Sequence, residues 1–218
     1  MLTRRSFLSL TGAAVLGAAA LALPGCGESR GAASSASASG AAAASSSAAA
    51  KSDSIVVYFS RTGENYGVGV IEEGNTAIVA KMVAEKTGAD LFEIVPSEAY
   101  PEGYDECCEV ALAEQNAGAR PAFAQNIDLT PYSTVYLGYP IWWGDLPMCV
   151  YTFLEAHDWA GKDIHPFCTH AGSGLSGTES KIASTCSGAN VGQGLSIAGT
   201  TAQNSRDQAQ AAVDAWLA

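Results

Sequence analysis

From residue 54 onward, five short apolar runs alternate with segments whose apolar residues recur at helical spacing. Each run has the length of a β-strand, and an unbroken apolar run of that length is typical of a strand buried in a parallel sheet. Strands that alternate with helices form a parallel sheet covered on both faces. The pattern therefore predicts an α/β sandwich with a five-stranded sheet. The predicted strands are 54–60, 90–96, 133–140, 163–170 and 194–200.

A helix is predicted after each of these strands. Asn75 or Thr76 can cap the first helix, and Gly88 and Gly118 are placed to end the first and the second. Pro166 weakens the pattern of the fourth strand. The predicted helices are 75–88, 102–118, 146–158, 176–188 and 204–218.

The first 25 residues carry the features of an export signal. Arg4 and Arg5 form a twin-arginine pair, a short apolar stretch follows, and residues 23–26 read LPGC. This pattern predicts a bacterial lipoprotein signal in which Cys26 is lipidated. An ordinary signal peptide or an N-terminal anchor with a coincidental cysteine is the alternative. The twin-arginine route exports folded proteins, often with a cofactor inserted, so the signal also indicates a cofactor protein.

Residues 26–53 form a tract rich in alanine, serine and glycine. The tract has no apolar pattern that could offset the entropy cost of ordering it, so a flexible tether is predicted. A single domain is expected over 54–218. Together these segments predict an extracytoplasmic protein that its lipid anchors to the bacterial cell membrane.

The net charge and the cysteine spacing limit which partners and metal sites are expected. The formal net charge of −11 argues against nucleic acid as a partner and is compatible with docking to a basic protein surface. The six cysteines show no spacing of a zinc or iron–sulfur site, so no metal is predicted. Buried thiols are expected at Cys149 and Cys168. The adjacent Cys107 and Cys108 are expected on a helix away from the strand ends, and no disulfide pairing can be read from the sequence.

Ligands of parallel sheets bind outside the C-terminal ends of the strands, so the residues that follow each strand are informative. Hydroxyl groups follow the first strand, two tryptophans follow the third, and a Gly/Ser turn follows the fourth. Hydroxyls beside a helix N-terminus can hold a phosphate, tryptophan offers a flat surface, and glycine admits close approach of the backbone. The three segments predict a site for a phosphorylated, planar aromatic molecule.

Eleven residues, 64–74, interrupt the first of these segments. They separate the strand exit at Ser60 from the helix start at Asn75. The spacing of GVIEEGNT matches a P-loop, but Asn75 stands where that loop needs its lysine, so this motif is rejected. We interpret the two halves as one anion site, with the insertion as a solvated loop. Tyr66 reaching back over the ligand is the alternative.

From Ile55 to the C-terminus, the chain resembles the flavodoxin family through the motifs YFSRTG…GNT, GYPIWWGDLP and THAGSG. The resemblance implies a three-layer sandwich with strand order 2-1-3-4-5, and FMN as the cofactor. It implies that one tryptophan of the pair stacks on the flavin while the other packs in the core, and that Arg61 either contacts the phosphate or points to solvent. By resemblance, the FMN-binding residues are Ser60, Arg61, Thr62, Asn75 and Thr76 for the phosphate, Pro140, Ile141, Trp142, Trp143 and Gly144 beside the ring, and Thr169, Gly172, Ser173 and Gly174 as a third wall.

Other polar residues near these segments have simpler interpretations. Asp145 is expected to cap a helix rather than to act as an acid. His157 is expected near the end of a helix, as a last-turn cation or surface residue. His170 is either a loop histidine exposed to solvent or a neighbour of the flavin. No catalytic residue is assigned.

The function predicted is that of an FMN-binding electron-transfer protein that docks on redox protein partners, which the sequence does not identify. The first alternative is an FMN-dependent NAD(P)H or quinone oxidoreductase. The second is a flavodoxin-like fold that binds no flavin and serves as an adaptor.

Overall fold

The computed structural model describes residues 52–218, and the predicted signal peptide, Cys26 and nearly all of the tether lie outside this range. Its central sheet is parallel in every pairing. The strands run in the order β4 (Asp90–Glu93), β1 (Ser54–Tyr58), β5 (Thr134–Pro140) and β6 (Asp163–His170), followed by β7 (Asn190–Val191) and β8 (Leu195–Ala198), which both pair with β6. The predicted strand order is confirmed.

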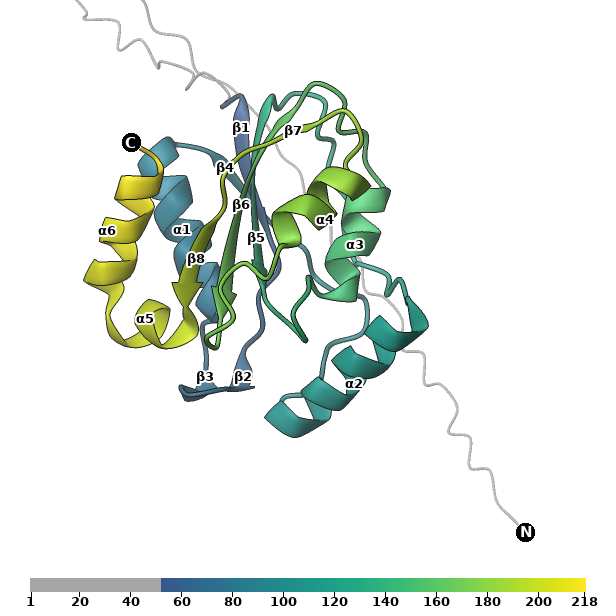
Figure 1. The fold of residues 1–218 in the computed structure, drawn as a ribbon, viewed down its shortest axis with the longest axis vertical. Helices are drawn as coiled ribbons and strands as arrows, with labels where there is room; N and C mark the ends of the chain where they lie inside the picture. Colours follow the sequence, from purple (N-terminus) through teal and green to yellow (C-terminus); the bar gives the residue numbers. More distant parts are fainter. Residues whose placement is uncertain (1–51) are drawn as a thin grey trace, which may run out of the picture. The chain divides into compact units, whose positions relative to one another are not determined.

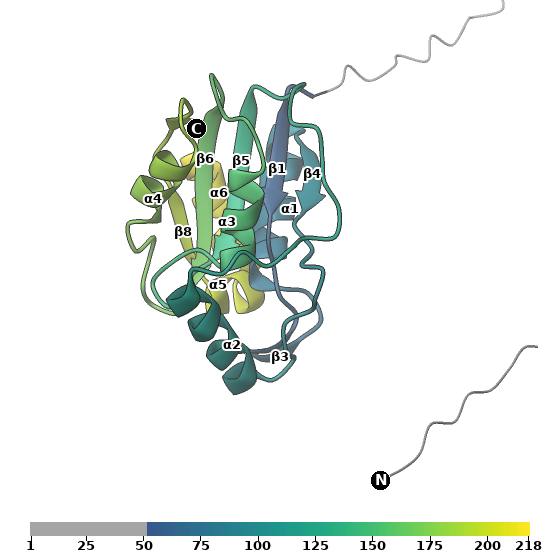
Figure 2. The same ribbon diagram turned by 90° about the vertical axis from the view of Figure 1, so that its right-hand side faces the viewer.

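The helices lie on both faces of this sheet, as Figures 1 and 2 show. One face carries α1 (Asn75–Thr87), α5 (Gly199–Asn204) and α6 (Arg206–Trp216). The other carries α3 (Met148–Glu155) and α4 (Thr178–Thr185), while α2 (Tyr104–Ala117) lies beside the edge where the strands end. Gly88 and Gly118 end α1 and α2 as predicted. The predicted terminal helix corresponds to α6, whereas the short α5 before it was not predicted.

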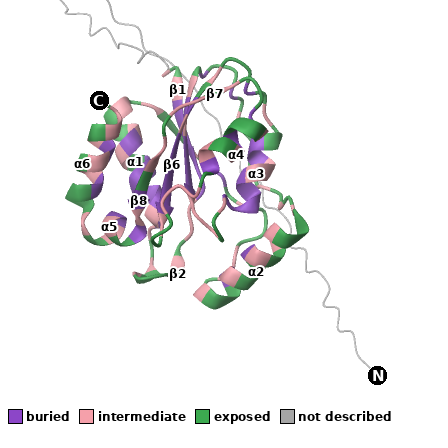
Figure 3. Cartoon of the chain, in the orientation of Figure 1, coloured by how far each residue is buried: buried purple, intermediate pink, exposed green. Residues whose placement is uncertain are grey.

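Side chains that alternate along the strands fill two separate cores. In β1 and its exit, Ile55, Val57 and Phe59 face the core under α3 and α4, whereas Val56 and Tyr58 face the core under α1 and α6. This alternation follows from the pleat of a strand, and it explains why the run is apolar at every position. Burying each large apolar side chain contributes about 1.5–3 kcal/mol. Figure 3 shows the buried strands between helices whose outer faces are exposed.

The fifth position in the sheet is occupied by two short strands rather than one. β7 pairs with the start of β6 and β8 with its end. The Ile164 carbonyl accepts a hydrogen bond from Gly192, so this edge of β6 faces β7. Pro166 lies two residues further and faces the same way, but it has no N–H to donate. The interruption between β7 and β8 therefore falls beside this proline.

The insertion at 64–74 is not the loop that the sequence predicted. Most of it folds into a hairpin of β2 (Gly63–Asn65) and β3 (Gly69–Ile71), which pair antiparallel. Figure 1 shows this hairpin at the edge of the domain where the strands end, near α2. Among residues 52–218, no helix combines the length and apolar character that a membrane span needs.

Replacement of Gly138 by alanine should destabilise the fold. Gly138 lies opposite Phe167 in the parallel register of β5 and β6, and a Cβ at this glycine would overlap the Phe167 ring. Overpacking of this kind costs about 1–3 kcal/mol. Urea denaturation should show a lower free energy of unfolding for Gly138→Ala. The double variant Gly138→Ala/Phe167→Leu should lose less than the sum of the two single variants, and simple additivity would contradict the contact.

Candidate functional site

A cavity of about 660 Å³ opens where the strands end. Four kinds of element line it: the exits of the strands, the start of α1, the inserted hairpin and α2 as far as Leu112. The lining residues are Arg61, Asn65, Tyr66, Asn75, Tyr104, Asp105, Cys107, Cys108, Glu109, Ala111, Leu112, Pro140, Ile141, Trp142, Trp143, Thr169, His170, Ala171 and Gly199. Its position agrees with the general rule for ligand sites of open α/β sheets.

The strand exit and the helix start that the insertion separates in sequence are in direct contact. A Cβ at Gly74 would overlap the Ser60 hydroxyl and lie 2.6 Å from the Arg61 carbonyl oxygen, so only glycine permits this approach. The Ser60 Oγ accepts a hydrogen bond from the Ala77 N–H at 3.0 Å. Ser60 thus caps α1 from outside the helix, and the first N–H groups of α1 have no partner within the helix.

Asn75 lines the cavity, and its side chain holds an unusual polar atom. Its Oδ1 is buried and, among residues 52–218, it is the one buried side-chain oxygen or nitrogen for which no hydrogen-bond partner is found. The amide packs against Gly199 at the exit of β8, where a Cβ would lie 2.5 Å from Nδ2. A buried polar atom without a partner costs about 1–3 kcal/mol, so a ligand that satisfies it gains that amount.

The hydroxyl groups of Thr76 and Thr169 satisfy each other. The two groups are 2.8 Å apart, and both residues are almost fully buried. This bond joins the second residue of α1 to the end of β6. Thr76 therefore fixes the helix start against the sheet, while Thr62 lies exposed and does not line the cavity.

Trp142 to Asp145 form a tight turn after β5. The Trp142 N–H donates to the Asp145 carbonyl at 2.9 Å, and the Asp145 N–H donates back to the Trp142 carbonyl at 3.0 Å. The two central residues, Trp143 and Gly144, have φ of 50° and 71°. A residue other than glycine in this region costs about 1–3 kcal/mol, so the surrounding structure must hold Trp143 there.

The two tryptophans have separate environments. Trp142 packs edge-on against Phe59 and Tyr100, with ring centroids 5.4 and 4.9 Å away. Trp143 is 55% exposed, and its indole N–H donates to the Cys108 carbonyl of α2 at 3.0 Å. Both residues line the cavity, and Trp143 does so from beside α2.

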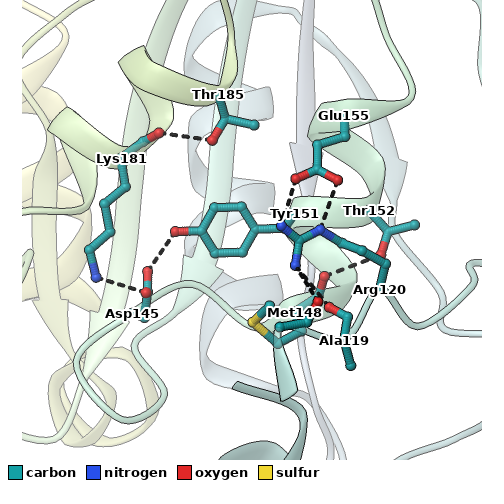
Figure 4. Close-up of polar contacts among 10 residues, drawn as sticks. Ala119, Arg120, Asp145, Met148, Tyr151, Thr152, Glu155, Lys181 and Thr185 are labelled. Carbon is teal, nitrogen blue, oxygen red and sulfur yellow. Dashed lines mark hydrogen bonds and ion pairs between the residues drawn. The ribbon is translucent and has the colours of Figure 1, made fainter. Parts of the chain in front are cut away.

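Asp145 anchors this turn and does not cap a helix, so the prediction of an N-cap is wrong. Its Oδ1 accepts hydrogen bonds from the Leu146 N–H and the Tyr151 hydroxyl, each at 2.8 Å. Its Oδ2 forms an ion pair with Lys181 of α4 at 2.7 Å. Figure 4 shows the carboxylate between the Tyr151 hydroxyl and the Lys181 amine.

Tyr151 connects Asp145 to Arg120, because its hydroxyl contacts the first and its ring the second. The Arg120 guanidinium lies over the Tyr151 ring at 5.2 Å and holds Glu155 through two hydrogen bonds of 2.7 Å. Figure 4 shows these groups side by side. Because Arg120 follows α2 while Tyr151 and Glu155 lie on α3, the contacts tie the end of α2 to the support of the tryptophan turn.

The exit of β6 contributes Thr169, His170 and Ala171 to the cavity. The Gly172 N–H donates to Nδ1 of His170 at 2.9 Å. Burial lowers the pKa of the His170 imidazole, which keeps the ring neutral at pH 7. The predicted wall of Gly172, Ser173 and Gly174 is therefore not part of the lining, which ends one residue earlier.

Arg61 does not point to solvent, and its guanidinium is bonded to backbone carbonyl groups. It donates five hydrogen bonds, to Glu64, Pro101, Glu102 and Gly103. Their lengths run from 2.6 to 3.1 Å. Since Glu64 lies on the hairpin and the other three precede α2, Arg61 clamps these two segments together.

Glu64 completes the junction of the hairpin with α2. Its N–H donates to the Glu102 carbonyl at 2.8 Å, and its carboxylate accepts from the Tyr104 N–H at 3.2 Å. The carboxylate therefore interacts with an N-terminal amide of α2, whose preceding residue, Gly103, has no side chain to do so. The ring of Tyr66 lies 6.0 Å from that of Tyr104. The insertion thus forms one wall with α2.

Cys107 and Cys108 line the cavity, which corrects the expectation that they lie away from the strand ends. Burial raises the pKa of the Cys107 thiol to about 11, so this thiol stays protonated at neutral pH. The five cysteines among residues 52–218 are all free thiols, and Cys149 and Cys168 are buried as predicted. In the same range, no group of three or more His, Cys, Asp or Glu side chains is placed to hold a metal ion.

The predicted site residues divide into two sets. Arg61, Asn75, Pro140, Ile141, Trp142, Trp143 and Thr169 line the cavity. Ser60, Thr62, Thr76, Gly144, Gly172, Ser173 and Gly174 do not.

Sequence reasoning missed the wall built by α2 and by Gly199. The predicted site draws on the exits of the first, third and fourth predicted strands only. The exit of the second leads to α2, so the same rule applied there would have indicated that side of the cavity. Gly199 lies inside the predicted fifth strand, 194–200, so the rule would not have indicated it.

Weakening of the Arg61 clamp should loosen the wall without unfolding the domain. In Arg61→Lys the positive charge remains, but an ammonium group cannot reproduce the fork of the guanidinium. Hydrogen exchange should show the N–H groups of Glu64 and Tyr104 losing about tenfold or more in protection, since each lost hydrogen bond contributes about 1.5 kcal/mol. Protection in β1 and β5 should be unchanged, as it should be throughout in the control variant Arg206→Lys. Unchanged protection of Glu64 would contradict the clamp.

Comparison with known proteins agrees with this architecture. No protein among the curated ones matches the chain. A candidate flavoprotein from Bacteroides uniformis is 29% identical, with a TM-score of 0.61 over 76% of this chain and 99% of that one. A second, from Bacteroides eggerthii, is 26% identical, with a TM-score of 0.59 over 76% and 98%. A flavoprotein from Lactobacillus acidophilus, solved in complex with FMN, is 20% identical, with a TM-score of 0.53 over 76% and 98%. The model of the flavodoxin family matches residues 53–215. The chain therefore belongs to the flavodoxin family.

Proposed function

We propose that this protein binds FMN in the cavity and transfers electrons to and from redox partners outside the cytoplasm. The observation that supports this most is the buried Asn75 Oδ1, which has no partner among residues 52–218 and belongs to a residue that lines the cavity at the start of α1. An amide there can accept from a ribityl hydroxyl, or, turned by 180°, can donate to a phosphate. The same fold holds FMN in the Lactobacillus acidophilus protein.

The start of α1 fits a phosphate in its chemistry. The first N–H groups of a helix have no partner within it, and the helix dipole favours an anion at this end. Ser60 already satisfies Ala77, which leaves the N–H groups of Asn75 and Thr76 for a ligand. Gly74 keeps the strand exit close enough for both sides to face one anion.

The aromatic side of the cavity fits a flat ring system. Trp142 and Trp143 both line it, and the anchored turn holds their backbone in place. FMN, when bound, supplies reversible transfer of one or two electrons. The protein's own contribution is to orient the ring, to exclude water with the wall of the hairpin and α2, and to keep His170 neutral beside it.

Binding of FMN can be tested with the isosteric variant Asn75→Asp. This change places a negative charge beside the proposed phosphate, while an acidic residue in the first turn should not weaken the helix. We expect the Kd for FMN to rise about tenfold or more, equivalent to about 1.4 kcal/mol, and the Kd for riboflavin, which has no phosphate, to change little. Titrations monitored by flavin fluorescence measure both.

Asn126→Asp is the matched control, because Asn126 lies exposed in a loop away from the cavity. Its affinity for FMN should equal that of the unmodified chain. If the purified protein is colourless and binds no added FMN, the proposed function is wrong.

The tether is proposed from the sequence alone, because Cys26 lies outside the described residues. If Cys26 is lipidated, cell fractionation should find the full chain in the membrane fraction, released only by detergent. In Cys26→Ser the protein should move to the soluble extracytoplasmic fraction. A variant that stays in the membrane fraction would show that another anchor holds the chain.

A further inference from the structure

The wall formed by the hairpin and α2 offers uncovered aromatic surface. Tyr66 is 63% exposed, and its ring lies 6.0 Å from that of Tyr104, tilted by 44°. Both line the cavity, as does the 55% exposed Trp143. These three rings belong to three separate segments that the contacts described above hold together. Exposed aromatic rings inside a cavity favour a ligand that presents a flat apolar face.

The charges on this wall are negative. Asp105 and Glu109 line the cavity from α2 and are exposed. The helix α2 carries four acidic residues and no basic one. Of the lysines and arginines among residues 52–218, Arg61 alone lines the cavity, and its guanidinium is bonded to backbone carbonyl groups. His170 adds no charge, because burial lowers its pKa.

The N-terminus of α2 does not offset these charges. The carboxylate of Glu64 accepts a hydrogen bond from the Tyr104 N–H. The carboxylate of Glu106 lies against Gly103, in the space that a side chain at this position would need. The partial positive charge at the N-terminus of α2 is therefore already offset by the carboxylates of Glu64 and Glu106. These carboxylates would repel an added anion.

We propose that this wall, together with Trp143, binds a flat aromatic molecule that carries no negative charge, and that it discriminates against anionic ones. The inference rests on the proposed function, since the molecule would exchange electrons with FMN bound in the same cavity. Neutral and cationic aromatic redox compounds meet this requirement. NADH and NADPH do not, because their phosphates carry negative charge.

Three biaryl probes of similar size and different charge can test the charge preference. They are oxidised methyl viologen, a dication; 4,4′-bipyridine, which is neutral; and biphenyl-4,4′-disulfonate, a dianion. Each is titrated into the FMN-loaded full chain without a reductant, and binding is measured by calorimetry. At about 10 mM ionic strength, we expect the Kd to rise about fivefold or more at each step from dication to neutral to dianion. At about 0.5 M salt the three values should converge.

Variants assign the effect to the wall. Asp105→Asn/Glu109→Gln should reduce the ratio of Kd between dianion and dication about fivefold or more, whereas Glu85→Gln, a change at an exposed residue of α1, should leave that ratio unchanged. Tyr66→Ala, at a largely exposed residue, should weaken all three probes without changing their order. Circular dichroism checks that each variant is folded, and the salt dependence of the unmodified protein is a test that needs no variant.

The inference is overturned if the dianion binds as tightly as the dication at low salt, or if removal of the two carboxylates leaves the ratio unchanged. It is also overturned if NADH binds more tightly than bipyridine. The flavin absorbance of each sample separates this failure from that of the proposed function. A yellow protein without charge preference contradicts only the inference, whereas a protein that cannot be loaded with FMN contradicts the proposed function.

Discussion

The start of α1 rests directly on the exit of β1, and the arrangement of the C-terminal edge of the sheet depends on this contact. Gly74 allows the approach, and the Ser60 hydroxyl then satisfies the Ala77 N–H. Because this contact holds the ends of the insertion together, the residues between them must leave the sheet and return to the same place. The entropy cost of closing such a loop grows slowly with its length, so the insertion does not break the site.

Arg61 determines where the inserted hairpin packs, because it holds the hairpin against the start of α2. Its hydrogen bonds to carbonyl groups on both sides convert a hairpin and a helix start into one wall. An arginine suits this position because its planar group presents several donors at once and stays charged. The Glu64 carboxylate then interacts with the first turn of α2, so the hairpin and the helix support each other.

The sheet was predictable from the sequence, because burial on both faces leaves a plain apolar run, as in β1, and Gly88 and Gly118 mark helix ends. The strand order came from the family resemblance. The strand-exit rule could have placed α2 near the cavity, but the contacts that hold the segments around it, such as Ser97 N–H to the Ala122 carbonyl, leave no pattern of side chains. The role of Asp145 was missed for a related reason, because its partner Lys181 comes from a distant helix.

The start of α1 and the wall of the hairpin and α2 differ in their response to a negatively charged group. The difference follows from the groups that each of them contributes. At the start of α1 the donors are neutral amides, so an anion held there keeps its full negative charge. At the wall, Asp105 and Glu109 add carboxylates of the same sign. A phosphate held at the start of α1, as proposed above, would add to the wall in raising the cost of bringing a second anion into the cavity. The insertion joins these two regions through the Arg61 clamp, and any change that moves the hairpin alters the aromatic and the charged parts of the wall together.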